Sequence, residues 1–223
     1  MAFISTKALT TPGLFEGQTS LTVIHSNDID STKIRYPSTL KKLVFKHRPS
    51  SGPENLIIFP DTIEDLELDI NYELEYVVFP SGLKYLTLGY YFDKSIKDVD
   101  FPQTLTHLTL GCRFNQDIRN ANLPRNLTHL SLGYRFNCDV KHANLPKTLT
   151  HLSFGDGFVQ DITNAMFPQS LIFLSLGNNF NHDIRAVNFP QGLQHLTLGS
   201  NFHQNIDGAA FPPNLNVTIV RRN

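Results

Sequence analysis

A proline recurs every 22 residues through most of this chain. The series is Pro80, Pro102, Pro124, Pro146, Pro168, Pro190 and Pro212. Pro60 and Pro37 continue it upstream at intervals of 20 and 23 residues. A constant period of this length is typical of a solenoid, in which each repeat forms one coil that contacts only its neighbours.

Each repeat carries the pattern LxxLxL, which begins three residues after the proline. Its rows are Leu83, Leu105, Leu127, Leu149, Leu171 and Leu193, then Leu86, Leu108, Leu130, Leu152, Leu174 and Leu196, then Leu88, Leu110, Leu132, Phe154, Leu176 and Leu198. The last two positions are two residues apart, the period of a β-strand, so the residues beside them must face the opposite way. Because 22 residues are too few for a strand, a full helix and two turns, we expect one short parallel strand, a turn at the following glycine and an irregular return in each coil.

Further rows complete the predicted coil. Phenylalanine recurs at Phe92, Phe114, Phe136, Phe158, Phe180 and Phe202, and an aliphatic residue at Ile96, Ile118, Val140, Ile162, Ile184 and Ile206. We expect the phenylalanines to form an aromatic spine. We expect Asn115, Asn137 and Asn181, which follow the spine, to satisfy backbone groups left unpaired in a non-helical turn.

Aspartates also recur, and like charges on stacked coils repel each other. They are Asp117, Asp139, Asp161 and Asp183, and basic residues follow three of them at Arg119, Lys141 and Arg185. We expect these two rows to neutralise each other in an ion-pair ladder.

The repeats divide the chain into four parts of a single domain. We predict an N-terminal cap over 1–36, degenerate repeats over 37–79, six regular repeats over 80–211 and a C-terminal partial repeat or cap over 212–223. The first and last parts depart from the period, as terminal repeats usually do.

The consensus PxxLxxLxLGxxFNxxI resembles the FNIP repeat family, a variety of leucine-rich repeat known from social amoebae and giant DNA viruses. Its clearest copies are PQTLTHLTLGCRFNQDI (102–118), PRNLTHLSLGYRFNCDV (124–140) and PQSLIFLSLGNNFNHDI (168–184). We therefore predict a β-rich, leucine-rich-repeat-like solenoid, a right-handed coil of 22-residue repeats with a parallel sheet on its concave face and an irregular convex return. Family members often join these repeats to an F-box that recruits a ubiquitin ligase. The predicted cap is too short for one, and a link to that machinery stays open.

The outward strand positions form two rows on the predicted concave face, which solenoids commonly use to bind partners. The first row is Tyr85, His107, His129, His151, Phe173 and His195, and the second is Thr87, Thr109, Ser131, Ser153, Ser175 and Thr197. We expect either stacked neutral imidazoles beside a hydroxyl ladder or a contact surface for a protein. A shared metal ion is disfavoured because the histidines run in single file without converging carboxylates or thiols. Acidification should charge neighbouring histidines together and loosen this face.

A second candidate surface follows the glycine turn of three consecutive coils. Its residues are Tyr90, Tyr91, Arg113, Tyr134 and Arg135. Tyrosine and arginine are enriched at interface hot spots, so these five residues join Tyr85, His107, His129, His151 and His195 as predicted partner contacts. Upstream, Lys42 and Lys46 are followed by Asp65, Glu67 and Asp69, which indicates a solvated charged face or a docking end.

Composition excludes several classes of protein. A formal net charge of −1 argues against a nucleic-acid partner, and no long apolar run predicts a membrane span or a secretory signal. We expect a cytoplasmic protein, in the host cytoplasm if the source is viral. Cys112 and Cys138 occupy different repeat phases and are expected to be free thiols.

These observations favour a non-catalytic module that binds an unidentified protein partner, with no cofactor and no metal. The alternative is an architectural or self-assembling scaffold, and we expect a monomer or weak self-association. A metal-binding or hydrolytic protein that uses the histidine file is the third alternative. It is disfavoured because each serine and histidine pair lies on one flat strand, without a buried acid or oxyanion donors.

Overall fold

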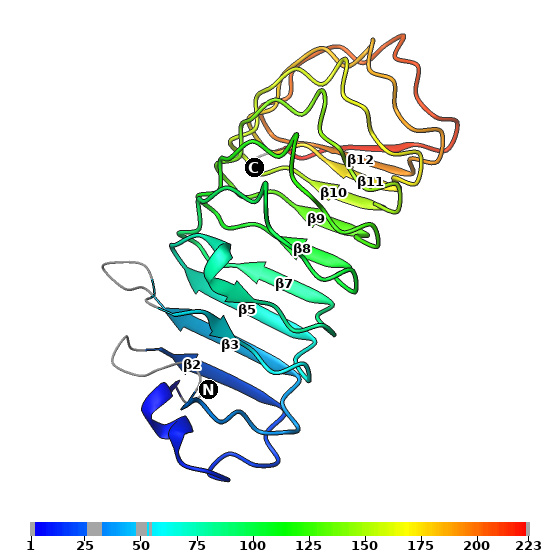
Figure 1. Ribbon diagram of the computed structural model, residues 1–223. Coiled ribbons are helices and arrows are strands. Elements are labelled where there is room, and N and C mark those ends of the chain that lie inside the picture. The colour runs from blue at the N-terminus through cyan, green and yellow to red at the C-terminus, as the bar shows by residue number, and fades with distance from the viewer. Residues whose placement is uncertain (1–2, 26–32, 48–52, 54, 222–223) are drawn as a thin grey trace.

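The computed structural model describes residues 3–25, 33–47, 53 and 55–221. Eleven strands form one sheet whose order follows the chain, β1-β2-β3-β5-β7-β8-β9-β10-β11-β12-β13, and they lie one after another from end to end (Figure 1). Their bounds are β1 Phe3–Ser5, β2 Ser20–Ile24, β3 Lys42–His47, β5 Asp65–Ile70, β7 Tyr85–Leu88, β8 His107–Thr109, β9 His129–Ser131, β10 His151–Ser153, β11 Phe173–Ser175, β12 His195–Leu198 and β13 Asn216–Ile219. Two further strands, β4 (Ile57–Ile58) and β6 (Val77–Val78), form a second sheet, and η1 (Thr6–Thr10) and η3 (Leu74–Tyr76) are short 3-10 helices. The predicted parallel solenoid is confirmed.

The sheet pairs equivalent residues of successive repeats. Leu130 of β9 lies opposite Leu108 of β8 and Leu152 of β10, and every strand pair is parallel. Residues 1–36, which we expect to cap the first coil, contribute β1 and β2 to the same sheet. The sheet therefore extends through this segment, and the boundaries proposed for the four parts stay predictions.

The core lies between the sheet and the return segments. The three leucine rows are almost fully buried. The spine phenylalanines stack nearly face to face, with ring centroids 6.2 Å apart between Phe114 and Phe136 and 6.1 Å apart between Phe158 and Phe180. One coil alone would leave these side chains exposed, so adjacent coils stabilise each other by mutual burial.

The turn after each strand brings the backbones of two coils into contact. A Cβ atom on Gly133 would overlap the carbonyl oxygen of Gly111, and one on Gly177 would overlap that of Gly155. The atoms that would be overlapped belong to the backbone of the neighbouring coil, which cannot move aside as a flexible side chain could. The glycine row therefore permits the close stacking of the coils.

Side-chain oxygens beside the spine satisfy the backbone of the next coil, as expected for an asparagine ladder. The backbone nitrogen of Asn137 donates to Asn115 Oδ1 at 2.8 Å, and the backbone nitrogen of Val159 donates to Asn137 Oδ1 at 2.9 Å. The His203 nitrogen donates to Asn181 Oδ1 at 2.9 Å. Valine has no side-chain oxygen, so position 159 interrupts the ladder before Asn181.

The recurring aspartates have a structural role that we did not predict. Each accepts a hydrogen bond from the backbone nitrogen two residues later, for example Arg119 N to Asp117 Oδ1 at 2.8 Å and Lys141 N to Asp139 Oδ1 at 2.9 Å. The ion pair of Asp117 with Arg119, 2.7 Å between Oδ2 and Nη2, lies within one coil. Lys141 reaches the next coil, with its Nζ 3.5 Å from Asp161 Oδ2. The charges are neutralised mainly inside each turn.

We predict that Phe136→Ala lowers the free energy of unfolding by about 3–5 kcal/mol, because it leaves a cavity between the rings of two neighbouring coils. Urea denaturation followed by circular dichroism measures the change. Tyr134→Ala, two residues away and 55% exposed, is the control and should change stability by less than about 0.5 kcal/mol. Equal losses for both variants would contradict the proposed role of the spine.

Candidate functional site

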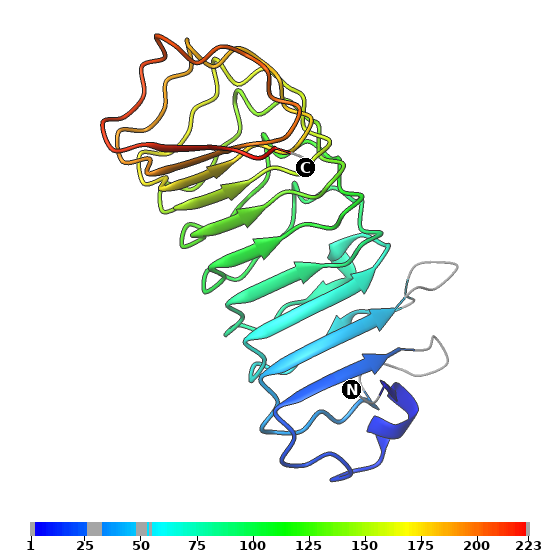
Figure 2. The ribbon, with the colours of Figure 1, turned by 180° about the vertical axis from the view of Figure 1, so that it is seen from behind.

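A groove crosses the outward face of the sheet over strands β8 to β12. It has a volume of about 340 Å³, and Figure 2 shows the strands that form its floor side by side. We call the row of rings along it the aromatic column, consisting of Tyr85 on β7, beside the groove, and His107, His129, His151, Phe173 and His195, which line it. We call its second row the hydroxyl row, consisting of Thr109, Ser131, Ser153, Ser175 and Thr197. The structure thus brings five of the ten predicted contact residues into one line.

The aromatic column is a continuous stack of rings. The centroids of His107 and His129 are 4.0 Å apart, as are those of His129 and His151, with interplanar angles of 13° and 12°. Phe173 continues the stack 4.3 Å from His151 and 4.3 Å from His195. Tyr85 ends it, tilted, 4.5 Å from His107. The rings cover one another's faces, so a ligand meets mainly their edges.

A threonine holds one ring nitrogen of each of three histidines. The Oγ1 atoms of Thr106, Thr128 and Thr150 lie 2.9, 2.9 and 2.8 Å from the Nδ1 atoms of His107, His129 and His151. With Nδ1 engaged, Nε2 is the ring nitrogen that remains for a ligand. We did not predict this contact, although the repeated sequence Thr-His-Leu is its signal.

The stack disfavours protonation of these histidines. Desolvation lowers the pKa of all three, and repulsion from His129 lowers the pKa of His107 and of His151 further. Two unit charges 4 Å apart repel by about 1 kcal/mol in water and by about 4 kcal/mol at a typical protein surface. A second proton on an adjacent ring is therefore harder to add than the first.

The stacked geometry is unlike a zinc site. Parallel rings direct their nitrogen lone pairs side by side, whereas a tetrahedral ion needs ligands that converge on one point. Among the described residues no group of three or more His, Cys, Asp or Glu side chains could hold a metal ion.

The predicted rim residues form a smaller cluster beside the column. The Arg113 guanidinium carbon lies 4.8 Å from the ring centroid of Tyr91 and 5.8 Å from that of Tyr90. The two tyrosine rings are 4.9 Å apart and meet edge to face. Tyr134 and Arg135 are exposed on the next coil. Their contribution to one surface with the other three stays a prediction.

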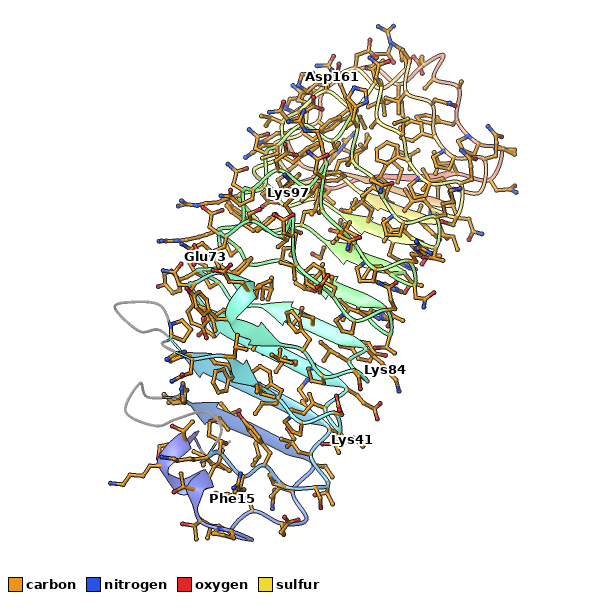
Figure 3. The ribbon with its side chains drawn as sticks, in the orientation of Figure 1. Phe15, Lys41, Glu73, Lys84, Lys97 and Asp161 are labelled. Carbon is orange, nitrogen blue, oxygen red and sulfur yellow. The ribbon has the colours of Figure 1, made fainter. Side chains whose placement is uncertain are left out.

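Several charged residues of the upstream coils form ion pairs. Lys42 Nζ lies 2.6 Å from Asp65 Oδ2. Lys41 and Lys84 lie along one edge of the sheet (Figure 3), and both contact Glu64, at 2.9 and 2.6 Å. These exposed pairs are screened by solvent and add little to stability.

A buried histidine cluster at the carboxyl ends of β2 and β3 was not predicted. His47 Nδ1 lies 3.0 Å from the Tyr72 hydroxyl, and its ring centroid lies 4.4 Å from that of His25. Burial and the nearby His25 lower the pKa of His47 to about 4. Both histidines lie outside the regular repeats, so no periodic row pointed to them.

We predict that the protein loses stability as the pH falls from 7 towards 4. The pKa values of His47, His107, His129 and His151 lie below the unfolded reference of about 6.5. The unfolded chain therefore binds more protons over this range, and each of these histidines costs at most about 1.4 kcal/mol per pH unit. His129→Phe should reduce the loss, because phenylalanine already occupies this row at Phe173. Melting temperatures across the pH range measure the difference, and His47 contributes equally to both proteins. Superimposable pH profiles would contradict the coupling within the column.

Comparison with models of known protein families identifies the repeat. The FNIP Repeat family matches residues 71–113, 92–135, 114–157, 136–179, 158–201 and 180–217. A search of curated proteins found no match.

No helix in the described part of the chain has the length and apolar character to cross a membrane.

Two solved structures are similar to the chain. One is CroV588, described as a novel circular LRR protein and of giant-virus origin, with a TM-score of 0.67 and 31% identity over 92% of this chain. This chain spans only 34% of CroV588. The other is the internalin InlF of Listeria monocytogenes, with a TM-score of 0.51, 16% identity, and coverage of 92% of this chain and 67% of that one. Internalin supports the fold alone. Because the family pattern covers more than half of the sequence, the chain belongs to the FNIP repeat family.

Proposed function

We propose that this chain is a non-catalytic protein-interaction module whose docking surface is the groove over β8 to β12. The observation that carries this proposal is the groove itself, about 340 Å³ in volume and lined by the aromatic column and the hydroxyl row. These side chains point away from the core, so they are free to contact a partner. Repeat solenoids offer extended surfaces of this kind for binding.

The rim cluster extends the proposed surface. Tyr90, Tyr91 and Arg113 combine large exposed rings with a guanidinium held over them, and such residues dominate many interfaces. Catalysis has less support. Ser131 and His129 are two residues apart on one strand, and Thr128 occupies the Nδ1 atom that an orienting acid would need. We also propose a cytoplasmic location, supported by the free thiols of Cys112 and Cys138.

We predict that Ser131→Arg with Ser175→Arg abolishes capture of the partner, because two long charged side chains would fill the groove. The matched control is Met166→Arg with Asn144→Arg, at exposed positions of the return. Affinity capture from lysate of the source cell or its host, quantified by mass spectrometry, compares the two with wild type. A partner kept by wild type and control but reduced at least about tenfold by the groove variant supports the proposal.

Thermal melts should show that both variants stay folded. Equal capture of the same partner by the groove variant would rule out the groove as the docking surface.

We propose self-assembly as a second candidate function, supported by the last strand. Among the strands that the structure describes, β13 pairs with β12 alone. The inward Val217 and Ile219 are partly exposed, whereas the equivalent Leu196 and Leu198 of β12 are fully buried. Exposed edges with apolar residues favour pairing with another chain. CroV588, to which this chain is similar, is described as a circular LRR protein.

We predict that the mass of the protein measured by light scattering rises with concentration, and that Val217→Glu with Ile219→Glu prevents the rise by placing charge at this apolar edge. Asn216→Glu with Thr218→Glu is the control, because it adds the same charge to the outward face of the same strand. A constant monomer mass for wild type across the series would exclude assembly.

A further inference from the structure

Four basic side chains without carboxylate partners lie in the turns next to β8, β9 and β10. Arg113 and Arg135 lie in the turns after β8 and β9, and Arg125 and Lys147 lie in the turns before β9 and β10, all exposed. Within the described residues none of the four makes an ion pair, in contrast to Arg119 and Arg185 on the return. We call these four residues the basic frame.

The carboxylates of the same coils are already engaged. Asp117 and Asp161 accept hydrogen bonds from their own turns and pair with Arg119 and Lys141. Asp139 accepts from the Lys141 nitrogen, and Asp156 accepts from the Asn178 backbone and side-chain nitrogens at 3.1 and 2.8 Å. Within the described residues none of these carboxylates pairs with the basic frame, although Asp139 and Asp156 are hydrogen-bonded only to neutral N–H groups and keep their negative charge.

The titratable groups on the outward face of β8 to β10 are all histidines. His107, His129 and His151 face one another, Tyr85 of β7 closes one end and the uncharged Phe173 of β11 the other. Their other neighbours on the face are hydroxyls. No outward position of β7 to β12, all of which the structure describes, holds a carboxylate. Beyond Tyr85, the outward positions of β5 carry Asp65, which pairs with Lys42, and Glu67, which lies beside Thr87. Lys84, next to Tyr85 in the chain, pairs with Glu64.

We infer that the groove over β8 to β10 binds an acidic peptide segment of a partner protein, with carboxylates on the basic frame and on the Nε2 edges of the histidines, and that this binding takes up protons. The inference deepens the proposed function and rests on it. The charge complementarity selects an acidic occupant, because the four unpaired basic side chains lie next to strands whose outward positions carry no carboxylate and whose histidines become positive on acidification.

The pH dependence has a definite sign. A carboxylate beside an imidazole favours the protonated ring, so the complex holds more protons than the free protein, and affinity rises as the pH falls. Each proton taken up can strengthen binding by at most about tenfold per pH unit. Glutamate, with a reference pKa of about 4.3, stays mostly ionised at pH 5.5.

A rhodamine-labelled peptide of eight glutamates tests the inference against the full chain. Fluorescence anisotropy at constant ionic strength should show affinity at least about tenfold higher at pH 5.5 than at pH 7.5. Calorimetry in two buffers of different ionisation enthalpy should show net proton uptake. A peptide of eight glutamines should bind at least about tenfold more weakly at pH 5.5; equal binding would overturn the choice of an acidic occupant.

Three variants locate the effect. His107→Phe, His129→Phe and His151→Phe together keep the ring stack and should abolish the pH dependence. Arg113→Gln with Arg135→Gln should weaken binding at both pH values, whereas Arg119→Gln with Arg185→Gln, at paired residues outside the groove, should not. A pH-dependent gain that survives in the triple histidine variant would overturn the inference.

The experiments distinguish failure of this inference from failure of the proposed docking function. If the arginine-filled groove variant loses its cellular partner but the glutamate peptide binds wild type equally at both pH values, the groove is a docking surface and only the acid-dependent mode is wrong. If the peptide binds as expected and no cellular protein is captured through the groove, the protein-docking function is wrong and an anion site remains.

Discussion

The solenoid depends on burial of each coil's leucines and phenylalanine against the same residues of its neighbours. A single 22-residue coil has no other surface against which to bury them, so no coil is stable alone. Every other regular feature follows from this contact. The glycine turns allow the coils to approach, and the asparagine side chains satisfy the backbone groups that the approach would otherwise leave unpaired.

The same constraint creates the functional surface. Once leucines are held in register, the residues between them are in register too, and identical side chains must stack on the opposite face. Histidine rings 4.0 Å apart are the result. Their shared environment makes the column behave as a coupled set, so the charge state of the groove is a property of several strands together and not of one residue.

The periodic part of this structure could be predicted from sequence. Each row recurs in every repeat, and the two-residue spacing within LxxLxL indicates which side chains face the core and which face outward. Leu130, Phe136 and Asn137 are examples whose roles follow directly from their place in the repeat. The hydrogen bond of Asp117 to its own turn was missed, since charge suggested an ion pair more readily than a local backbone contact. The position of His47 could not be predicted, because its burial comes from contacts in irregular coils. The outward row of histidines was expected from sequence, whereas the contact of Thr128 with His129 Nδ1 could be found only from atomic distances.

The interruption of the asparagine ladder at Val159 has a consequence for cooperativity. In a one-dimensional array, the whole unfolds as a unit only while the coupling between each pair of neighbours is strong. The interface between the coils that carry Val159 and Asn181 lacks the side-chain acceptor of the adjacent interfaces, and His182 Nε2 instead contacts the Val159 carbonyl oxygen at 2.7 Å. The spine continues across this interface, with the rings of Phe158 and Phe180 stacked. Coupling between these two coils therefore depends more on buried rings and leucines, and less on the asparagine ladder, than it does at the neighbouring interfaces.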